Sequence, residues 1–145
     1  MTRTPLVIGG TTVAALSAAG VLLAGPALGG SAATTHTLHL KVHTLKETEF
    51  SKHQFSEADQ LTSHGKKVGN DVLYGRIAGH TETGHVTAAL KGGTMRLTFT
   101  FDFTQGNSFA GKVTGGTGKY AGASGTITGT GTTKGADVTI KYTTP

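Results

Sequence analysis

A strict alternation of large apolar and polar residues from Met95 to Phe103 constrains the fold more than any other feature of this sequence. Successive side chains of a β-strand point to opposite faces, so the pattern predicts a strand with one apolar face. That face carries Met95, Leu97, Phe99, Phe101 and Phe103. We therefore expect residues 95–103 to form the best-defined strand of an all-β fold.

Seven other segments show shorter stretches that favour strands, and turn residues separate them. The predicted strands are 36–42, 59–63, 71–78, 85–90, 108–114, 124–130 and 137–142, with turns at 64–67, 82–84, 92–93, 105–107 and 134–135. Short connections between consecutive strands predict antiparallel neighbours. Such a meander either closes into a barrel or splits into a sandwich. Closure into an eight-stranded antiparallel barrel would remove exposed strand edges, which favours the closed barrel over the open sandwich.

Composition supports an all-β domain without covalent cross-links. After Ala33 the chain contains 23 Thr and 17 Gly, and its only proline is Pro145. Threonine suits the pleated sheet, whereas glycine suits turns, bulges and tight bends. The chain contains no cysteine, so its stability must come from strand pairing and the burial of apolar side chains.

The first 33 residues have the layout of a secretory signal peptide. A short basic start at Met1–Arg3 precedes an uncharged stretch from Leu6 to Leu28, and the small residues Ser31-Ala32-Ala33 follow. A permanent membrane anchor is the alternative, but four glycines and Pro26 dilute the apolar stretch, and two more glycines follow it directly. We expect cleavage after residue 33, a barrel domain over 34–145, no stable membrane anchor afterwards, and a secreted, extracellular location.

The charge pattern gives little support for nucleic-acid binding. After Ala33 the chain carries 12 Lys and Arg residues against eight acids. Nucleic-acid binders concentrate basic residues and interleave them with stacking aromatic residues. Here the lysines are scattered, and only Lys66 and Lys67 are adjacent. We therefore expect no nucleic-acid partner.

The seven histidines do not form a convincing metal site. His39 and His43 would share a strand face, but four residues along a strand span about 13 Å, too far for one ion. His80 and His85 could pair across a hairpin, but a metal site needs three or four convergent ligands. We expect no metal and no cofactor.

Familiar catalytic patterns are also missing from the sequence. It has no cysteine nucleophile and no Gly-x-Ser-x-Gly motif. Glu47 and Glu49 share a face, but the eight acids are scattered along the chain, which does not favour a hydrolase with paired carboxylates.

The segment Phe109–Gly125, with Gly115-Gly116-Thr117-Gly118 followed by Tyr120, resembles a signature of the allene oxide cyclase-like and dirigent-like barrel proteins. The turn 65–69 resembles the turn before the third strand of that family. The chain resembles a secreted, bacterial-type member of that family, and the resemblance covers about residues 36–145. It implies a calycin-type, eight-stranded barrel with an apolar cavity, possible assembly as a homo-trimer, and control over the cyclisation or coupling of a reactive organic intermediate.

The resemblance carries over the scaffold but not the reactive groups of the family. The cavity cysteine of the plant cyclase falls near Tyr74 or Gly75, and its acidic residue on the first strand falls near Thr44. The dirigent arginine falls at Ser124. The glycine-rich segment is expected to act in folding, because Gly115, Gly116 and Gly118 allow close strand approach and Tyr120 can pack over them.

The candidate ligand-binding residues lie on two strands. The face of residues 95–103 would form a cavity wall or plain core, and Tyr74 and Arg76 on the third strand would orient a polar ligand atom if they point inward. The proposed cavity wall comprises Tyr74, Arg76, Leu97, Phe99 and Phe101. No catalytic residue is assigned.

Two functions follow from these observations. In the first, the barrel binds a small hydrophobic or aromatic organic molecule and could steer its cyclisation or coupling, as an isomerase or cyclase would. In the second, it is a non-enzymatic extracellular structural or surface-interaction protein with a solid core. An interior above about 300 Å³ with one or two buried polar groups would favour the first.

Overall fold

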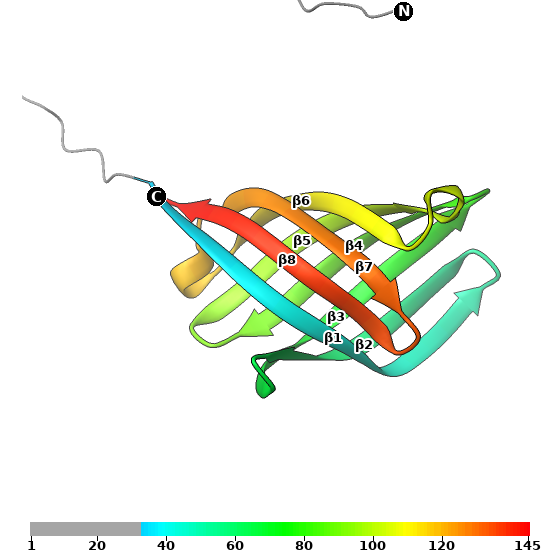
Figure 1. Ribbon diagram of the computed structural model, residues 1–145, viewed down its shortest axis with the longest axis horizontal. Coiled ribbons are helices and arrows are strands. Elements are labelled where there is room, and N and C mark those ends of the chain that lie inside the picture. Colours follow the sequence, from blue (N-terminus) through cyan, green and yellow to red (C-terminus); the bar gives the residue numbers. More distant parts are fainter. Residues whose placement is uncertain (1–32) are drawn as a thin grey trace, which may run out of the picture. The chain divides into compact units, whose positions relative to one another are not determined.

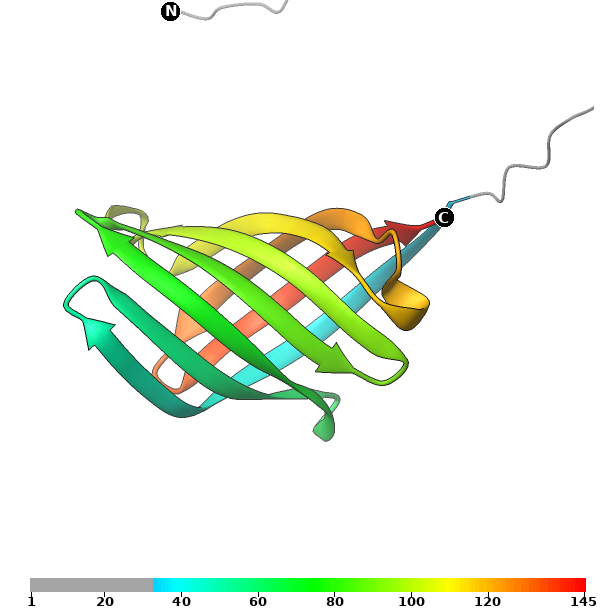
Figure 2. The ribbon, with the colours of Figure 1, turned by 180° about the vertical axis from the view of Figure 1, so that it is seen from behind.

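The computed structural model describes residues 33–145, which form a closed antiparallel barrel of eight strands. The strands are β1 (Thr34–Ser51), β2 (Gln54–Ser63), β3 (Lys66–Ala78), β4 (Thr81–Leu90), β5 (Gly93–Asp102), β6 (Ser108–Gly116), β7 (Ser124–Thr132) and β8 (Gly135–Thr144). Each strand pairs with the next, and β8 pairs with β1 to complete the barrel (Figures 1 and 2). The predicted fold class is therefore confirmed.

Residues 1–32 lie outside the part of the chain that the structure describes. The predicted signal peptide lies outside the described residues, apart from Ala33 at its end. Within residues 33–145, the chain has no helix with the length and apolar character needed to cross a membrane.

All eight predicted strands coincide with observed strands, but β1 and β2 extend much further than their alternation indicates. β1 continues to Ser51, and β2 begins at Gln54. A bulge at Leu45 separates the pairs Thr44–Asp59 and Lys46–Ala58. Polar residues such as Glu47 and Glu57 then occupy the inner face of this hairpin. The usual contrast between an apolar inner face and a polar outer face is therefore lost there.

Two local predictions are wrong. The chain turns at Gly79 and His80 and not at 82–84, because Gly79 adopts a positive φ of 62° and residues 81–90 are all in β4. The alternating run also ends before Phe103. The Asp102 carboxylate accepts hydrogen bonds from the backbone N–H and the hydroxyl group of Thr104. This starts the short 3₁₀ turn η1 (Phe103–Gln105) and leaves Phe103 exposed.

Tyr120 packs into the core beside the connection between β6 and β7. The 3₁₀ turn η2 (Gly118–Tyr120) follows the Gly-Gly-Thr-Gly segment and buries Tyr120, which is 3% exposed. Its ring lies 5.9 Å from that of Tyr142, centroid to centroid. The Cβ and backbone carbonyl of Tyr120, rather than its ring, occupy the space that a side chain at Gly116 would need. The glycines thus allow this segment to fold over the end of the barrel.

Aromatic rings in the other half of the barrel lie flat over glycines of neighbouring strands. A Cβ atom at Gly84 would contact the ring of Phe99, and one at Gly129 would contact the ring of Phe109. A Cβ atom at Gly75 would likewise contact the ring of Phe55. Glycine within a strand permits such close approach. The rings therefore lie against the barrel wall.

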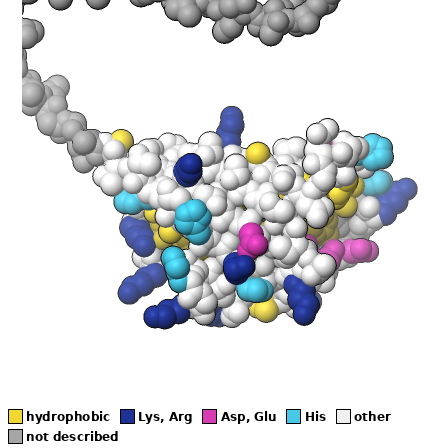
Figure 3. All heavy atoms as spheres, viewed as in Figure 1, with side chains coloured by type: hydrophobic (Ala, Val, Ile, Leu, Met, Phe, Trp, Pro, Cys, Tyr) yellow, Lys and Arg dark blue, Asp and Glu magenta, His cyan; other side chains and the backbone are white. Residues whose placement is uncertain are grey.

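The outer surface carries the basic residues. All 12 Lys and Arg residues after Ala33 are exposed, and several project from the face shown in Figure 3. Acidic side chains are few on that face. Asp137 forms an exposed ion pair of 3.1 Å with Lys41 between β8 and β1. Such a surface pair contributes little to stability.

Candidate functional site

The barrel encloses a cavity of about 550 Å³. One wall is apolar and comes from β5, β6 and β7. It carries Leu97, Phe99, Phe101, Phe109 and Ile127. The rings of Phe99 and Phe109 are tilted against each other, with centroids 5.5 Å apart. A cavity of this size and lining suits a small organic molecule.

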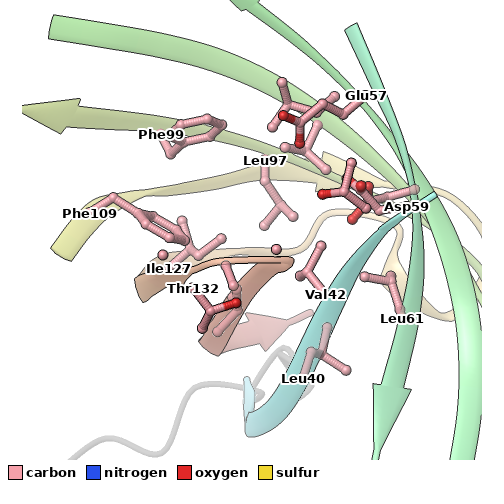
Figure 4. A pocket seen from close by; sticks show the side chains of 18 of the residues that line it. Leu40, Val42, Glu57, Asp59, Leu61, Leu97, Phe99, Phe109, Ile127 and Thr132 are labelled. Carbon is pink, nitrogen blue, oxygen red and sulfur yellow. The ribbon is translucent and has the colours of Figure 1, made fainter. Parts of the chain in front are cut away.

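The opposite wall is acidic. Five of the eight acids of the chain line the cavity, all from the first four strands. They are Glu47, Glu57, Asp59, Asp71 and Glu82. Figure 4 shows Glu57 and Asp59 across the cavity from Phe99 and Phe109. The sequence prediction that the acids are scattered does not hold in space, because strand pairing brings them onto one wall.

Asp59 and Asp71 are the most deeply buried of these acids. They are register partners on β2 and β3, and they are 2% and 8% exposed. Burial, a side-chain hydrogen bond to Asp59 and the charge of Asp59 raise the pKa of Asp71 from 3.8 to about 8. Asp71 therefore keeps its proton at neutral pH. The Oδ1 atoms of both residues have no hydrogen-bond partner among the described residues.

Glu57 and Glu82 extend the acidic wall toward the end of the barrel opposite Tyr120. Burial raises the pKa of Glu57 to about 7, and the charges of Asp59, Glu47 and Glu82 add to the shift. A hydrogen bond from the side chain of Thr44 opposes it. Burial and the charge of Glu47 also raise the pKa of Glu82. A carboxyl group that titrates near neutral pH can both donate and accept a proton.

Three of the five proposed cavity-wall residues do line the cavity, namely Leu97, Phe99 and Phe101. Tyr74 and Arg76 do not, because their side chains lie on the outer face of β3. Tyr74 is 46% exposed and stacks on Phe50. The inner face of β3 carries Asp71 and Leu73 instead. Gly75 follows on that face, where its missing side chain makes room for the ring of Phe55.

The acidic pair was not found from the sequence, although a signal was present. Asp59 and Asp71 each lie within a segment predicted to be a strand, where aspartate is disfavoured. Such a residue invites a functional explanation. The connection between the two strands also places them opposite each other. However, a bulge pairs Leu61 with Gly69 and Thr62 with Lys67, and no sequence pattern indicated it.

The histidines lie away from this site. None of the seven lines the cavity, and six are exposed. Within residues 33–145, no group of three or more His, Asp or Glu side chains is arranged to hold a metal ion. The acids and aromatic residues that line the cavity can take part in proton transfer, hydrogen bonding and the binding of an apolar surface.

Comparisons with known proteins show the fold of this chain but no family. No protein-family model matches the sequence, and no curated protein matches it. Among solved structures, a pyocyanin demethylase is similar with a TM-score of 0.64 and 23% sequence identity, over 74% of this chain and 99% of that protein.

A second similar structure is a nonspecific heme-binding cyclase that catalyses a [4 + 2] cycloaddition during neoabyssomicin biosynthesis. It has a TM-score of 0.56 and 15% identity, and the match covers 78% of this chain and 61% of the cyclase. The resemblance seen in the sequence is thus supported at the level of the barrel. The chain shares its eight-stranded architecture with proteins whose names describe enzymes that act on small organic molecules.

Proposed function

We propose that this chain is an exported, hollow barrel that binds a small hydrophobic or aromatic molecule and steers its cyclisation or coupling, as allene oxide cyclase-like and dirigent-like proteins do. The cavity of about 550 Å³ carries the proposal. A solid core, which the structural alternative requires, would leave no such space. The similar structures, a demethylase and a cyclase, point to the same class of function.

The two walls have separate roles in this proposal. The apolar wall around Phe99, Phe109 and Ile127 holds the ring system or hydrocarbon of the ligand and fixes its shape. Positioning of this kind accelerates an intramolecular reaction without a covalent intermediate. The carboxyl pair of Asp59 and Asp71, which keeps a proton on Asp71, forms hydrogen bonds with a polar atom of the ligand and can exchange a proton with it.

Filling the cavity tests this function. Val86 lines the cavity from β4, whereas its neighbour Thr87 points outward. Val86→Trp places an indole ring across the cavity, so we expect at least a tenfold loss of affinity for 9-ethylanthracene, a neutral aromatic probe. Thr87→Trp adds the same ring outside and should leave the affinity unchanged. Fluorescence titration of the full chain measures both.

The paired variants keep the result interpretable. Both variants contain residues 1–33, so any binding of the probe to that segment is the same in the two proteins. A difference in affinity between the two variants therefore reports on the cavity. Equal affinity for the two variants, or no binding by the wild-type chain, would contradict the proposed function. Matching circular dichroism spectra would show that both variants fold.

Export and assembly complete the proposal. A chain that enters the secretory route should be recovered from the medium with the mass of residues 34–145, and intact mass spectrometry measures this directly. Full-length protein retained in cells would contradict it. The homo-trimer implied by the family resemblance stays a prediction, which light scattering on the same sample tests.

A further inference from the structure

Most acids of the described residues line the cavity, whereas the basic residues lie on the outer surface. Five acids line the cavity, whereas the 12 basic residues after Ala33 are all exposed. Among the residues that line the cavity, Lys134 is the only cation, and its side chain is exposed in the turn between β7 and β8. A cavity lined by charges of one sign concentrates ligands of the opposite sign.

The cavity also contains buried acceptors without donors. Asp59 and Asp71 are more than nine-tenths buried, and the Oδ1 atom of each has no hydrogen-bond partner in residues 33–145. Both residues line the cavity. At neutral pH the pair carries one proton, which Asp71 keeps and shares with Asp59 in a hydrogen bond. The unpartnered Oδ1 atoms are then acceptors, so the group that completes this site must donate hydrogen bonds to them. Buried polar groups of this kind are normally satisfied in a functional complex.

The position of these acceptors defines the shape of the ligand. The apolar wall of Phe99, Phe109 and Ile127 faces the acidic wall across the cavity (Figure 4). One molecule that satisfies both walls has an apolar, flat body and a positively charged donor at one end. A neutral hydrocarbon would leave the carboxyl groups unpaired, and an anion would be repelled by them.

Resting on the proposed function, we propose that the ligand of this cavity is an aromatic or polycyclic molecule bearing a protonated amine, whose N–H groups donate hydrogen bonds to Asp59 and Asp71. The acids Glu47, Glu57 and Glu82 attract the cation as it enters. The aromatic rings hold its body, and the carboxyl pair fixes the position of its nitrogen.

Four probes with one anthracene body test this inference by fluorescence titration at pH 7. They are 9-(aminomethyl)anthracene, its N,N,N-trimethylammonium analogue, 9-ethylanthracene and anthracene-9-carboxylate. We expect the primary ammonium to bind at least tenfold more tightly than 9-ethylanthracene, and the carboxylate to bind at least tenfold more weakly. The trimethylammonium probe has the charge but no N–H group, so its affinity should fall between those of the primary ammonium and 9-ethylanthracene.

Variants of the carboxyl pair locate the effect. The double substitution Asp59→Asn with Asp71→Asn should remove the preference for the ammonium probe over 9-ethylanthracene. Measurable binding of 9-ethylanthracene to the same variant shows that the cavity is still formed. Asp137→Asn, on the outer surface, should change neither.

The outcomes separate this inference from the proposed function. Binding of 9-ethylanthracene without a preference for the ammonium probe overturns the inference alone. Equal affinity for the primary and trimethylated ammonium probes overturns the assigned N–H contacts. A preference that survives in the double variant overturns the role of Asp59 and Asp71. Failure of all four probes to bind overturns the proposed function as well.

Discussion

Replacing Asp71 with asparagine is expected to raise the free energy of unfolding at pH 8 by at least about 2 kcal/mol. The wild-type carboxyl group has a pKa near 8 in the folded barrel, where burial and Asp59 oppose its ionisation. At about 1.4 kcal/mol per pKa unit, the pKa shift from 3.8 to about 8 sets an upper limit of roughly 6 kcal/mol on this gain in the free energy of unfolding. Asparagine has the same shape, carries no charge, and can donate a hydrogen bond to Asp59.

The sign of the effect follows from proton binding. Between pH 3.8 and about 8 the folded protein keeps the proton of Asp71, whereas the unfolded chain has lost it. Stability falls with rising pH wherever the folded state binds more protons. The stabilising contribution of this group is therefore complete below pH 3.8 and is lost as the pH rises through about 8. Glu57, with a pKa near 7, acts in the same direction.

Urea unfolding at pH 5 and pH 8 measures this prediction. The wild-type protein should lose stability between the two pH values, and Asp71→Asn should lose clearly less. Asp137→Asn is the matched control, because Asp137 forms an exposed ion pair with Lys41 and its loss should cost about 0–1 kcal/mol. A wild-type stability that rises from pH 5 to pH 8, or a variant less stable than wild type at pH 8, would contradict the account.

Truncating Tyr120 should have the second large effect. Tyr120→Ala is expected to lower the free energy of unfolding by about 3–5 kcal/mol, as large aromatic truncations in a core do. The ring is almost completely buried, packs at a tilt against the ring of Tyr142 and lies under the Lys119 amine, which is 4.9 Å from the ring centroid. Its removal leaves a void beside Tyr142 in the core.

Tyr120→Phe separates the ring from the hydroxyl group. It keeps the ring contact with Tyr142, so we expect its stability to stay within about 1.5 kcal/mol of wild type. Thermal and urea unfolding of both variants provide the comparison. A cost below about 1 kcal/mol for Tyr120→Ala would show that the Gly-Gly-Thr-Gly segment and its tyrosine do not hold the end of the barrel together.

The strands were predictable because most inner faces are apolar. Along β5 the inward residues Met95, Leu97 and Phe99 are all buried, so the alternation in the sequence reports the structure directly. In the β1–β2 hairpin the inward residues include Glu47 and Glu57, and the same rule finds no strand there. The sequence signal was therefore lost where the cavity replaces a packed core.

The candidate site was predictable only on its apolar side. Leu97, Phe99 and Phe101 were identified because large apolar residues on one face imply an interior. Tyr74 and Arg76 were assigned to the cavity wall because a tyrosine or arginine inside an apolar barrel would orient a polar ligand atom, but both lie on the outer face of β3. The inner face carries Asp71, opposite Asp59, and Gly75, against the ring of Phe55. Both of these partners lie on β2, ten or more residues away in the chain.

A crystal structure of the full chain grown with 9-ethylanthracene tests the central claim most directly. If the barrel binds its ligand in the cavity, the three-ring system will lie inside it, in contact with Phe99, Phe109 and Ile127. The carboxyl groups of Asp59 and Asp71 will lie on the opposite side of the probe. An interior filled by inward-turned side chains, with the probe absent or bound only to the outer surface, would contradict it.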